Sequence, residues 1–104
     1  MAGLDPLLQH PTRLVVLAFL SGCIEAEFGA VRDHCAVSDS VLSKAATALE
    51  EAGYVAVKKG YVGKRPRTWL AATKAGRAAL AGHLAELQRL VAAAEAAGAE
   101  YGTS

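Results

Sequence analysis

The sequence predicts a single, mostly helical α+β domain. Three observations support this class: apolar residues recur at helical spacing in several stretches, a short segment in the middle alternates apolar and polar residues around a glycine-rich turn, and the last quarter carries one long helical pattern. A chain of 104 residues can bury one core, although a monomer of this size is only modestly stable. We expect one domain over residues 1–98 and a flexible tail over residues 99–104.

The first third of the chain predicts two helices. Proline suits the first turn of a helix because its missing N–H would have no partner there, so we expect the first helix to begin at Pro11. It runs to about Ser21, where a glycine follows. Phe28-Gly29 then looks like a short extended segment, which leads into a second helix over residues 30–35.

The stretch from Val37 to Gly53 predicts a capped helix with two faces. Ser38 stands where an N-cap belongs, and Gly53 stands where a left-handed C-cap belongs. The apolar arc consists of Val41, Leu42, Ala45, Ala48, Leu49 and Ala52. The other arc carries short polar side chains, which suit close approach to base edges and phosphates. Two short helices joined by a tight turn are the helix-turn-helix arrangement, with this stretch as its recognition helix.

The positive charge is concentrated in one block. The formal net charge of the whole chain is only +1, whereas residues 58–77 hold seven basic residues and no acidic one. We predict a strand over residues 54–59, a turn over 60–66 and a return strand over 67–72, which together form a hairpin with a basic tip. Trp69 is expected to cover the hairpin or a dimer seam, with base stacking as the alternative. The basic residues are Lys58, Lys59, Lys64, Arg65, Arg67, Lys74 and Arg77.

A long last helix is predicted over residues 74–97, capped by Thr73 and ended by Gly98. Its apolar residues recur at spacings of four and three, which is typical of a heptad seam. Because the helix is long for so small a domain, we expect its far half to pack on a second copy; a core helix within one chain is the alternative. We predict a dimer interface formed by Leu4, Leu7, Leu8, Leu80, Leu84, Leu87, Leu90, Val91 and Ala94.

Four segments give the chain a family resemblance. They are Pro11-Thr12-Arg13, VSDSVLSK over residues 37–44, LEEAGYV over residues 49–55 and GKRPRTW over residues 63–69. With these segments and its order of elements, the stretch from Leu4 to about Val91 resembles the small winged helix-turn-helix transcription regulators related to the MarR and ArsR types. The resemblance implies a homodimer whose recognition helices enter successive major grooves of double-stranded DNA, while both wings reach the flanking backbone or minor groove.

The resemblance also assigns candidate DNA contacts. It matches the groove-facing positions to Ser38, Asp39, Ser40, Ser43, Lys44 and Thr47, and the wing positions to Lys64, Arg65 and Arg67. Lys44 and three further cations are candidates for phosphate contacts, namely Arg13, Lys58 and Lys59. The chain departs from the family pattern at Ala45 and Ala46, where relatives often carry a bulkier and a more polar residue, and at Ala72. The first departure weakens the expectation of strong base readout.

We therefore hypothesise a dimeric, sequence-selective regulator, a repressor or another control protein, that binds a pseudo-palindromic site with half-sites roughly 34 Å apart. One alternative is a winged-helix module for protein contacts, whose basic wing meets an acidic partner. Another is a regulator in which ligand or thiol chemistry at His34-Cys35 switches the DNA affinity. More often, a cysteine such as Cys35 is a small buried hydrophobic residue. A small-molecule effector is possible, although the sequence does not indicate one.

Enzyme activity, cofactors, metals and membranes are not expected. The three histidines are scattered, and no Ser or Thr has a His and a carboxylate at motif spacing. Cys23 and Cys35 lie in no metal or redox spacing, which fits a reducing compartment, and the metal-binding Cys motif of ArsR-type sensors does not occur. The longest apolar run, residues 14–20, is far shorter than the roughly 20 residues of a membrane span. We expect a cytoplasmic protein.

Overall fold

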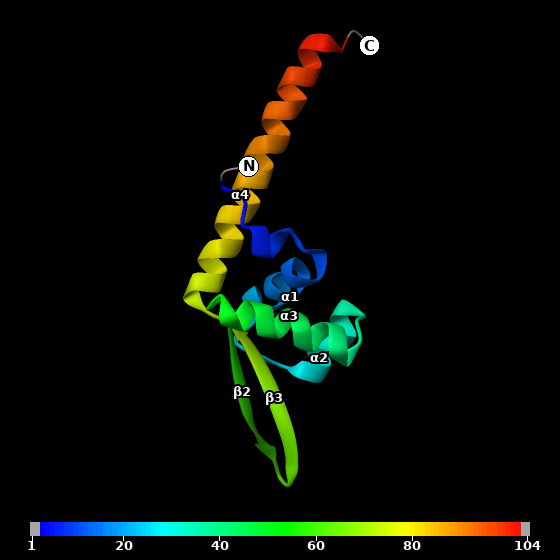
Figure 1. The fold of residues 1–104 in the computed structure, drawn as a ribbon, viewed down its shortest axis with the longest axis vertical. Helices are drawn as coiled ribbons and strands as arrows, with labels where there is room; N and C mark the ends of the chain where they lie inside the picture. The colour runs from blue at the N-terminus through cyan, green and yellow to red at the C-terminus, as the bar shows by residue number, and fades with distance from the viewer. Residues whose placement is uncertain (1–2, 103–104) are drawn as a thin grey trace.

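The computed structural model describes residues 3–102. The molecule is elongated, 66 × 25 × 20 Å, with a helical body at its middle, a β-hairpin projecting from one end and the last helix from the other (Figure 1). Its elements are η1 (Pro6–Gln9), α1 (Pro11–Ser21), β1 (Ala26–Glu27), α2 (Phe28–Cys35), α3 (Asp39–Glu51), β2 (Val55–Val62), β3 (Arg65–Ala72) and α4 (Lys74–Tyr101). This order confirms the predicted fold class. No helix of the described part is long and apolar enough to cross a membrane.

The helix-turn-helix is formed by α2 and α3, which are joined by a tight turn. Ala36 ends α2 in the left-handed conformation, with φ 54°. This conformation turns the chain, and α3 begins three residues later, at Asp39. The Ser38 hydroxyl accepts a hydrogen bond from the Val41 N–H at 3.1 Å, and Gly53 follows α3 with φ 79°. Both predicted caps of the recognition helix are therefore confirmed.

The segment before α2 differs from the prediction. The extended residues are Ala26 and Glu27, and Phe28 already opens the helix. This two-residue strand pairs antiparallel with β3, where Ala26 lies opposite Leu70 and Glu27 opposite Trp69. A strand this short is held by a partner far along the chain, so local patterning could not place it.

The hairpin is longer than predicted. The strands β2 and β3 pair from Val55 opposite Ala72 to Val62 opposite Arg65, so the turn narrows to Gly63 and Lys64. Gly63 has φ 63°, which glycine adopts without steric cost. Pro66 was predicted to lie in the turn, but it belongs to β3. At this position β3 pairs with β2 alone, because β1 pairs only with Leu70 and Trp69. The edge of β3 that faces away from β2 is therefore free, and a proline without an N–H is tolerated there.

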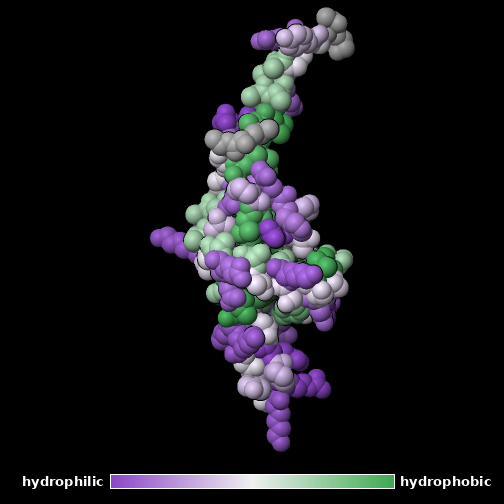
Figure 2. All heavy atoms as spheres, in the orientation of Figure 1, coloured by the Kyte–Doolittle hydropathy of each residue, from purple (hydrophilic) through white to green (hydrophobic). Residues whose placement is uncertain are grey.

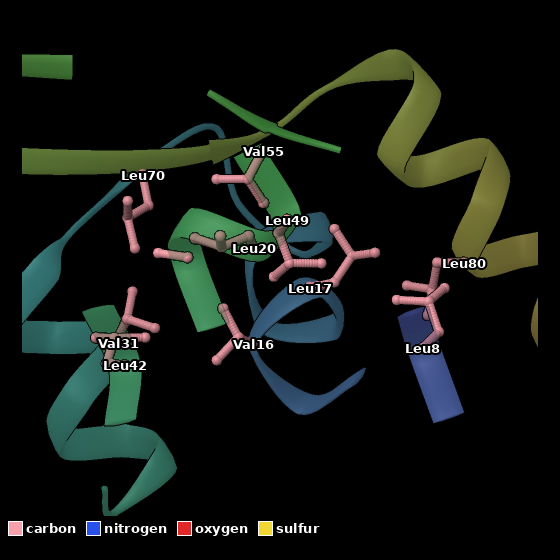
Figure 3. Close-up of a cluster of buried hydrophobic side chains, with 11 residues drawn as sticks. Leu8, Val16, Leu17, Leu20, Val31, Leu42, Leu49, Val55, Leu70 and Leu80 are labelled. Atoms are coloured by element: carbon pink, nitrogen blue, oxygen red, sulfur yellow. The ribbon is translucent and has the colours of Figure 1, made fainter. Parts of the chain in front are cut away.

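The core lies where α1, α3 and the base of the sheet meet (Figure 3). Burial of such aliphatic side chains contributes roughly 1.5–3 kcal/mol each and supplies most of the stability of the body. The recognition helix is fixed to this core, because Leu42 and Leu49 are fully buried. The buried cluster comprises Leu8, Val16, Leu17, Leu20, Val31, Leu42, Ala46, Leu49, Val55, Leu70 and Leu80.

The junction between the hairpin and α4 is closely packed. The Thr73 hydroxyl accepts from the Gly76 N–H at 3.0 Å and donates to the Gly53 carbonyl at 2.6 Å, so the predicted cap also ties α4 to the end of α3. Gly76 lies against the Tyr54 backbone: a Cβ at this position would stand 2.1 Å from the Tyr54 carbonyl oxygen. Only glycine permits this approach.

The predicted end of α4 is wrong. The helix continues through Gly98 to Tyr101 and is followed by Gly102, whose N–H donates to the Gly98 carbonyl at 2.8 Å. A glycine inside a helix costs only about 1 kcal/mol relative to alanine, which is too little to stop a helix by itself. The proposed tail over residues 99–104 is therefore helical over its first half, and residues 103–104 lie outside the described part.

A partly buried polar network joins three distant segments of the body. His83 of α4 is 2% exposed and accepts the Asp5 N–H at its Nδ1, 3.0 Å away. The Asp5 carboxylate accepts the Tyr54 hydroxyl at 2.5 Å and the Leu7 N–H at 3.0 Å. Asp5 raises the pKa of Tyr54, first through this hydrogen bond, with a smaller contribution from burial. Sequence patterns had suggested no role for His83.

Candidate nucleic-acid interface

The recognition helix presents a polar face to solvent. Ser40, Ser43, Lys44 and Thr47 are exposed, as helical periodicity predicts. The apolar face is turned slightly from the predicted arc: Ala46 is buried, whereas Val41 is 42% exposed. Since Ala45 and Ala46 are both only 5% exposed, neither faces the groove side. Their small size allows α3 to pack closely on the core.

Two predicted groove-facing residues at the start of α3 already have partners. The Ser38 hydroxyl caps the helix, as described above, so its main role is structural. The Asp39 carboxylate accepts from Arg32 Nη1 at 2.9 Å, and Arg32 Nε lies 3.0 Å from Asp33. Arg32 therefore bridges α2 and α3. Arg32 was not among the predicted site residues, although an Arg seven residues before an Asp across a predicted turn was a usable signal.

The cations of the hairpin fall into two groups. Arg67 lies 3.8 Å from Glu27 of β1, and Lys58 Nζ lies 5.8 Å from the centre of the Trp69 ring. Trp69 thus covers the hairpin, in line with the first of the two predicted roles. The other cations, Lys59, Lys64 and Arg65, are exposed and form no ion pair with any residue in 3–102.

Figure 2 shows hydrophilic side chains covering the projecting hairpin. Lys64 and Arg65 belong to its tip, where the two strands leave the body behind. Of the remaining cations in the basic block, Arg77 donates to the carbonyls of Ser21 and Cys23 and so closes the end of α1. Arg77 therefore stabilises the body and does not add to the positive charge of the hairpin surface.

A cleft of about 340 Å³ separates α3 from the hairpin. Ser43 and Thr47 line it from the helix, and Lys59 and Thr68, which face each other across the two strands, line it from the hairpin. Three hydroxyls and one ammonium group can all donate to a phosphate. Glu50 is the acidic residue among those that line this cleft. Thr68 was not predicted as a site residue, although cross-strand pairing places it on the same face as Lys59.

A second hollow brings Arg13 and Lys44 together. It measures about 310 Å³ and lies between the start of α1 and the middle of α3. Both cations are among the residues predicted to contact phosphates, and the hollow places them on the recognition-helix side of the body. Its walls are His10, Thr12, Arg13, Val41, Lys44 and Ala45.

The predicted dimer residues divide between core and surface. Leu8 is 1% and Leu80 7% exposed within one chain, so Leu8 has no surface for a partner and Leu80 almost none. Their assignment to a dimer interface was wrong, because both pack between η1, α4 and the body (Figure 3). Leu84 and Val91 are 41% and 55% exposed. Half-buried residues of the set are Leu4, Leu7, Leu87 and Leu90, and Ala94 is exposed.

The cysteines show no sign of a reactive site. Burial raises the pKa of the Cys35 thiol, which lowers its thiolate fraction at neutral pH. The neighbouring His34 ring packs on Phe19, with the ring centres 4.7 Å apart. Within residues 3–102, no group of three or more His, Cys, Asp or Glu side chains could hold a metal ion.

A family model for the winged helix DNA-binding domain matches residues 12–91. The chain belongs to this family. The hairpin of β2 and β3 is accordingly its wing, and the resemblance to small winged helix-turn-helix regulators is confirmed. No match was found among curated protein sequences.

Solved structures of transcriptional regulators share the winged-helix fold. A transcriptional regulator homologue from Pyrococcus horikoshii is 25% identical over 84% of this chain and 86% of its own, with a TM-score of 0.78. A PadR family regulator from Eggerthella lenta is 22% identical, with 86% and 82% coverage and a TM-score of 0.65. The zinc-responsive MarR family member ZitR from Lactococcus lactis is 15% identical, with 89% and 63% coverage and a TM-score of 0.59. This chain thus spans less than two thirds of ZitR, and the last two likenesses show the fold alone.

Proposed function

We propose that this winged-helix protein is a transcriptional repressor that binds double-stranded DNA as a homodimer. The observation that carries the proposal is the cleft between α3 and the wing, where hydroxyls from both elements and the ammonium group of Lys59 line one hollow. A strand of DNA backbone seated there would lie between the two grooves, with the polar face of α3 in the major groove. The regulators that share the fold support the same function.

Charge supports a division of labour within this interface. The exposed wing cations Lys59, Lys64 and Arg65 supply sequence-independent attraction to phosphates. On α3, Lys44 is the one basic residue, and the exposed hydroxyls of Ser43 and Thr47 are short enough to reach base edges. The wing therefore supplies most of the affinity, and the helix supplies selectivity.

The geometry of α4 supports the homodimer. Every residue from 91 to 102 is exposed within the single chain, although residues 91–101 are helical. An isolated helical end of this length is marginal in water, so a partner must supply the packing. Figure 2 shows hydrophobic side chains on the part of α4 that projects from the body. Leu84 and Val91 of this helix are exposed. A second copy with the same stripe would bury them.

DNA binding is tested by selecting bound fragments from a random pool and measuring their affinity by gel shift at two salt concentrations. Wild type should enrich a pseudo-palindrome and lose affinity steeply with salt. The double variant Lys64→Ala with Arg65→Ala should weaken binding to all sequences and lower the salt slope by about one unit for each phosphate that is no longer neutralised. Lys74→Ala with Arg89→Ala removes the same charge from α4 and is the matched control. Intact dimers with no DNA affinity at low salt would refute the proposal and favour a protein partner.

The dimer is tested by sedimentation equilibrium on a matched pair of variants. Leu84→Glu with Val91→Glu places two charges in the apolar stripe and should give a monomer. Ala85→Glu with Ala92→Glu adds the same charge one residue further along, on another side of α4, and should leave a dimer. A wild-type monomer at micromolar concentration would contradict the proposal. Repression is tested with a reporter gene whose promoter contains the selected site. Wild-type protein should lower the expression of this reporter.

A further inference from the structure

Asp39 is an unexpected residue on a DNA-binding face. It is the first residue of α3, its side chain is 71% exposed, and it is the one acid among the groove-facing candidates. DNA phosphates repel a carboxylate, and the groove strips it of water. At the interface such a residue needs a cation that offsets its charge, a donor group of the DNA that meets it, or both.

Arg32 changes what this carboxylate can do. Its Nη1 donates to Asp39 Oδ1 at 2.9 Å, while its Nε donates to Asp33 Oδ1 at 3.0 Å. The guanidinium is thereby held between two acids, one on α2 and one on α3. It offsets the charge of Asp39 and restrains the rotation of its side chain. Within the described part of the chain, Asp39 Oδ2 forms no hydrogen bond, so this oxygen remains available as an acceptor.

The major groove offers few donors to such an acceptor. Cytosine presents its N4 amino group there and adenine its N6 amino group. Adenine also presents the acceptor N7 beside N6, which repels a carboxylate, so cytosine is the base with which a carboxylate pairs. Guanine and thymine present the acceptors O6 and O4 at the corresponding place, which a carboxylate oxygen repels. The first residues of a recognition helix are the ones that commonly reach base edges. The position of Asp39 at the start of α3 and its free acceptor oxygen therefore both favour contact with a cytosine.

We propose that Arg32 and Asp39 form a base-reading pair, in which Asp39 Oδ2 accepts from the N4 amino group of a cytosine and Arg32 is the positioning residue. This inference rests on the proposed DNA-binding function and adds a specificity determinant to it. It also explains why Arg32 is directed along α2 toward α3 rather than outward to the phosphates. Each half-site should contain one cytosine that depends on Asp39.

The test compares DNA sites selected from a random pool by wild type, Asp39→Ala, Asp39→Asn, Arg32→Ala and Asp33→Ala. Wild type should select cytosine at one position of each half-site, and Asp39→Ala should relax that position alone, lowering its preference by about five- to tenfold. Its affinity for random DNA should rise, because a repelled charge has gone. Arg32→Ala should relax the same position partially. Asp33→Ala removes one of the two acids that hold Arg32 but leaves the contact of Arg32 with Asp39 in place, so it should relax this position less than Arg32→Ala does.

Several outcomes would overturn the pair. The inference fails if Asp39→Ala retains the wild-type motif, or if Arg32→Ala lowers the affinity for all sequences equally, since Arg32 would then be a phosphate contact. If Asp39→Ala does not fold, as judged by circular dichroism, Asp39→Asn decides. Asparagine keeps one acceptor oxygen for Arg32 and adds an amide donor, so the preference should move from cytosine toward adenine. A wild type that binds no DNA would instead refute the proposed function.

Discussion

The recognition helix and the wing differ in how they are built for the DNA contact proposed above. Helix α3 is fixed on the core by fully buried leucines and capped at both ends, yet it carries a single basic residue. The wing leaves the body after its first few residues, and its tip, with Lys64 and Arg65, is wholly exposed. Rigid packing suits a surface that must align with base edges, whereas charge on a projecting hairpin acts without close alignment. We therefore expect α3 to position the protein on DNA and the wing to supply most of the affinity.

The largest expected effect comes from breaking the junction on which both regions depend. Gly76→Ala would place a Cβ 2.1 Å from the Tyr54 carbonyl oxygen, where α3 ends and the wing begins. We expect the free energy of unfolding to fall by about 3 kcal/mol, measured by urea denaturation. Gly82→Ala, also in α4, meets nothing within 4 Å and should be neutral or stabilising by up to about 1 kcal/mol. Equal stability of the two variants would contradict this packing.

A comparison within the wing separates paired from unpaired cations. Arg65 has no ion-pair partner in residues 3–102, whereas Arg67, two positions along the same strand, lies 3.8 Å from Glu27. We expect Arg65→Ala to weaken DNA binding roughly tenfold and Arg67→Ala less than roughly threefold, measured by fluorescence anisotropy at constant salt. A larger loss for Arg67→Ala would show that the Glu27 pair opens when DNA binds.

A smaller effect is expected at Tyr54, which links the end of α3 to the wing. Its hydroxyl donates to Asp5, and this bond raises the pKa of Tyr54. Because the folded pKa is raised, the stabilisation is complete below the unfolded value of about 10 and is lost as pH rises through the folded value. Tyr54→Phe should therefore cost about 1 kcal/mol at neutral pH and progressively less above about pH 10. Urea titrations of both proteins across this range check it, and a difference independent of pH would contradict it.

The smallest effects on affinity are expected on the helix. Ser43→Ala and Thr47→Ala each remove one hydroxyl from the cleft and leave the net charge unchanged. We expect each to weaken binding only a few-fold, while the ratio of specific to random DNA affinity falls by a similar factor. Competition binding with both DNAs measures this ratio. An unchanged ratio would show that neither hydroxyl reads the site.

The sequence predicted the features that depend on residues close to one another in the chain. Ser38, Gly53 and Thr73 cap helices where the sequence places them, since a cap depends on residues three or four positions away. The block of cations predicted a basic hairpin, although not its full length. Polar and apolar periodicity likewise placed Ser43, Lys44 and Thr47 on the solvent side of α3.

Features set by distant partners were not predictable in this way. The length of the wing depends on an extended pairing ladder that tolerates Gly60 and Pro66, and β1 depends on β3. Leu80 matched a heptad seam and Leu8 was predicted to join it in a dimer interface, but both pack inside the body, because η1 folds back onto α4. The hydrogen bond of His83 spans 78 residues in sequence, so no motif could reveal it.

The central claim is that the wing supplies affinity and α3 supplies selectivity. Its most direct test measures dissociation constants against salt for wild type, for Lys64→Ala with Arg65→Ala, and for Ser43→Ala with Thr47→Ala, on both selected and random DNA. The wing variant should lose affinity on both DNAs alike and show a shallower salt dependence. The helix variant should keep the wild-type salt slope and lose mainly its preference for the selected site. If the two variants lowered affinity, slope and preference in the same proportion, the claim would be contradicted.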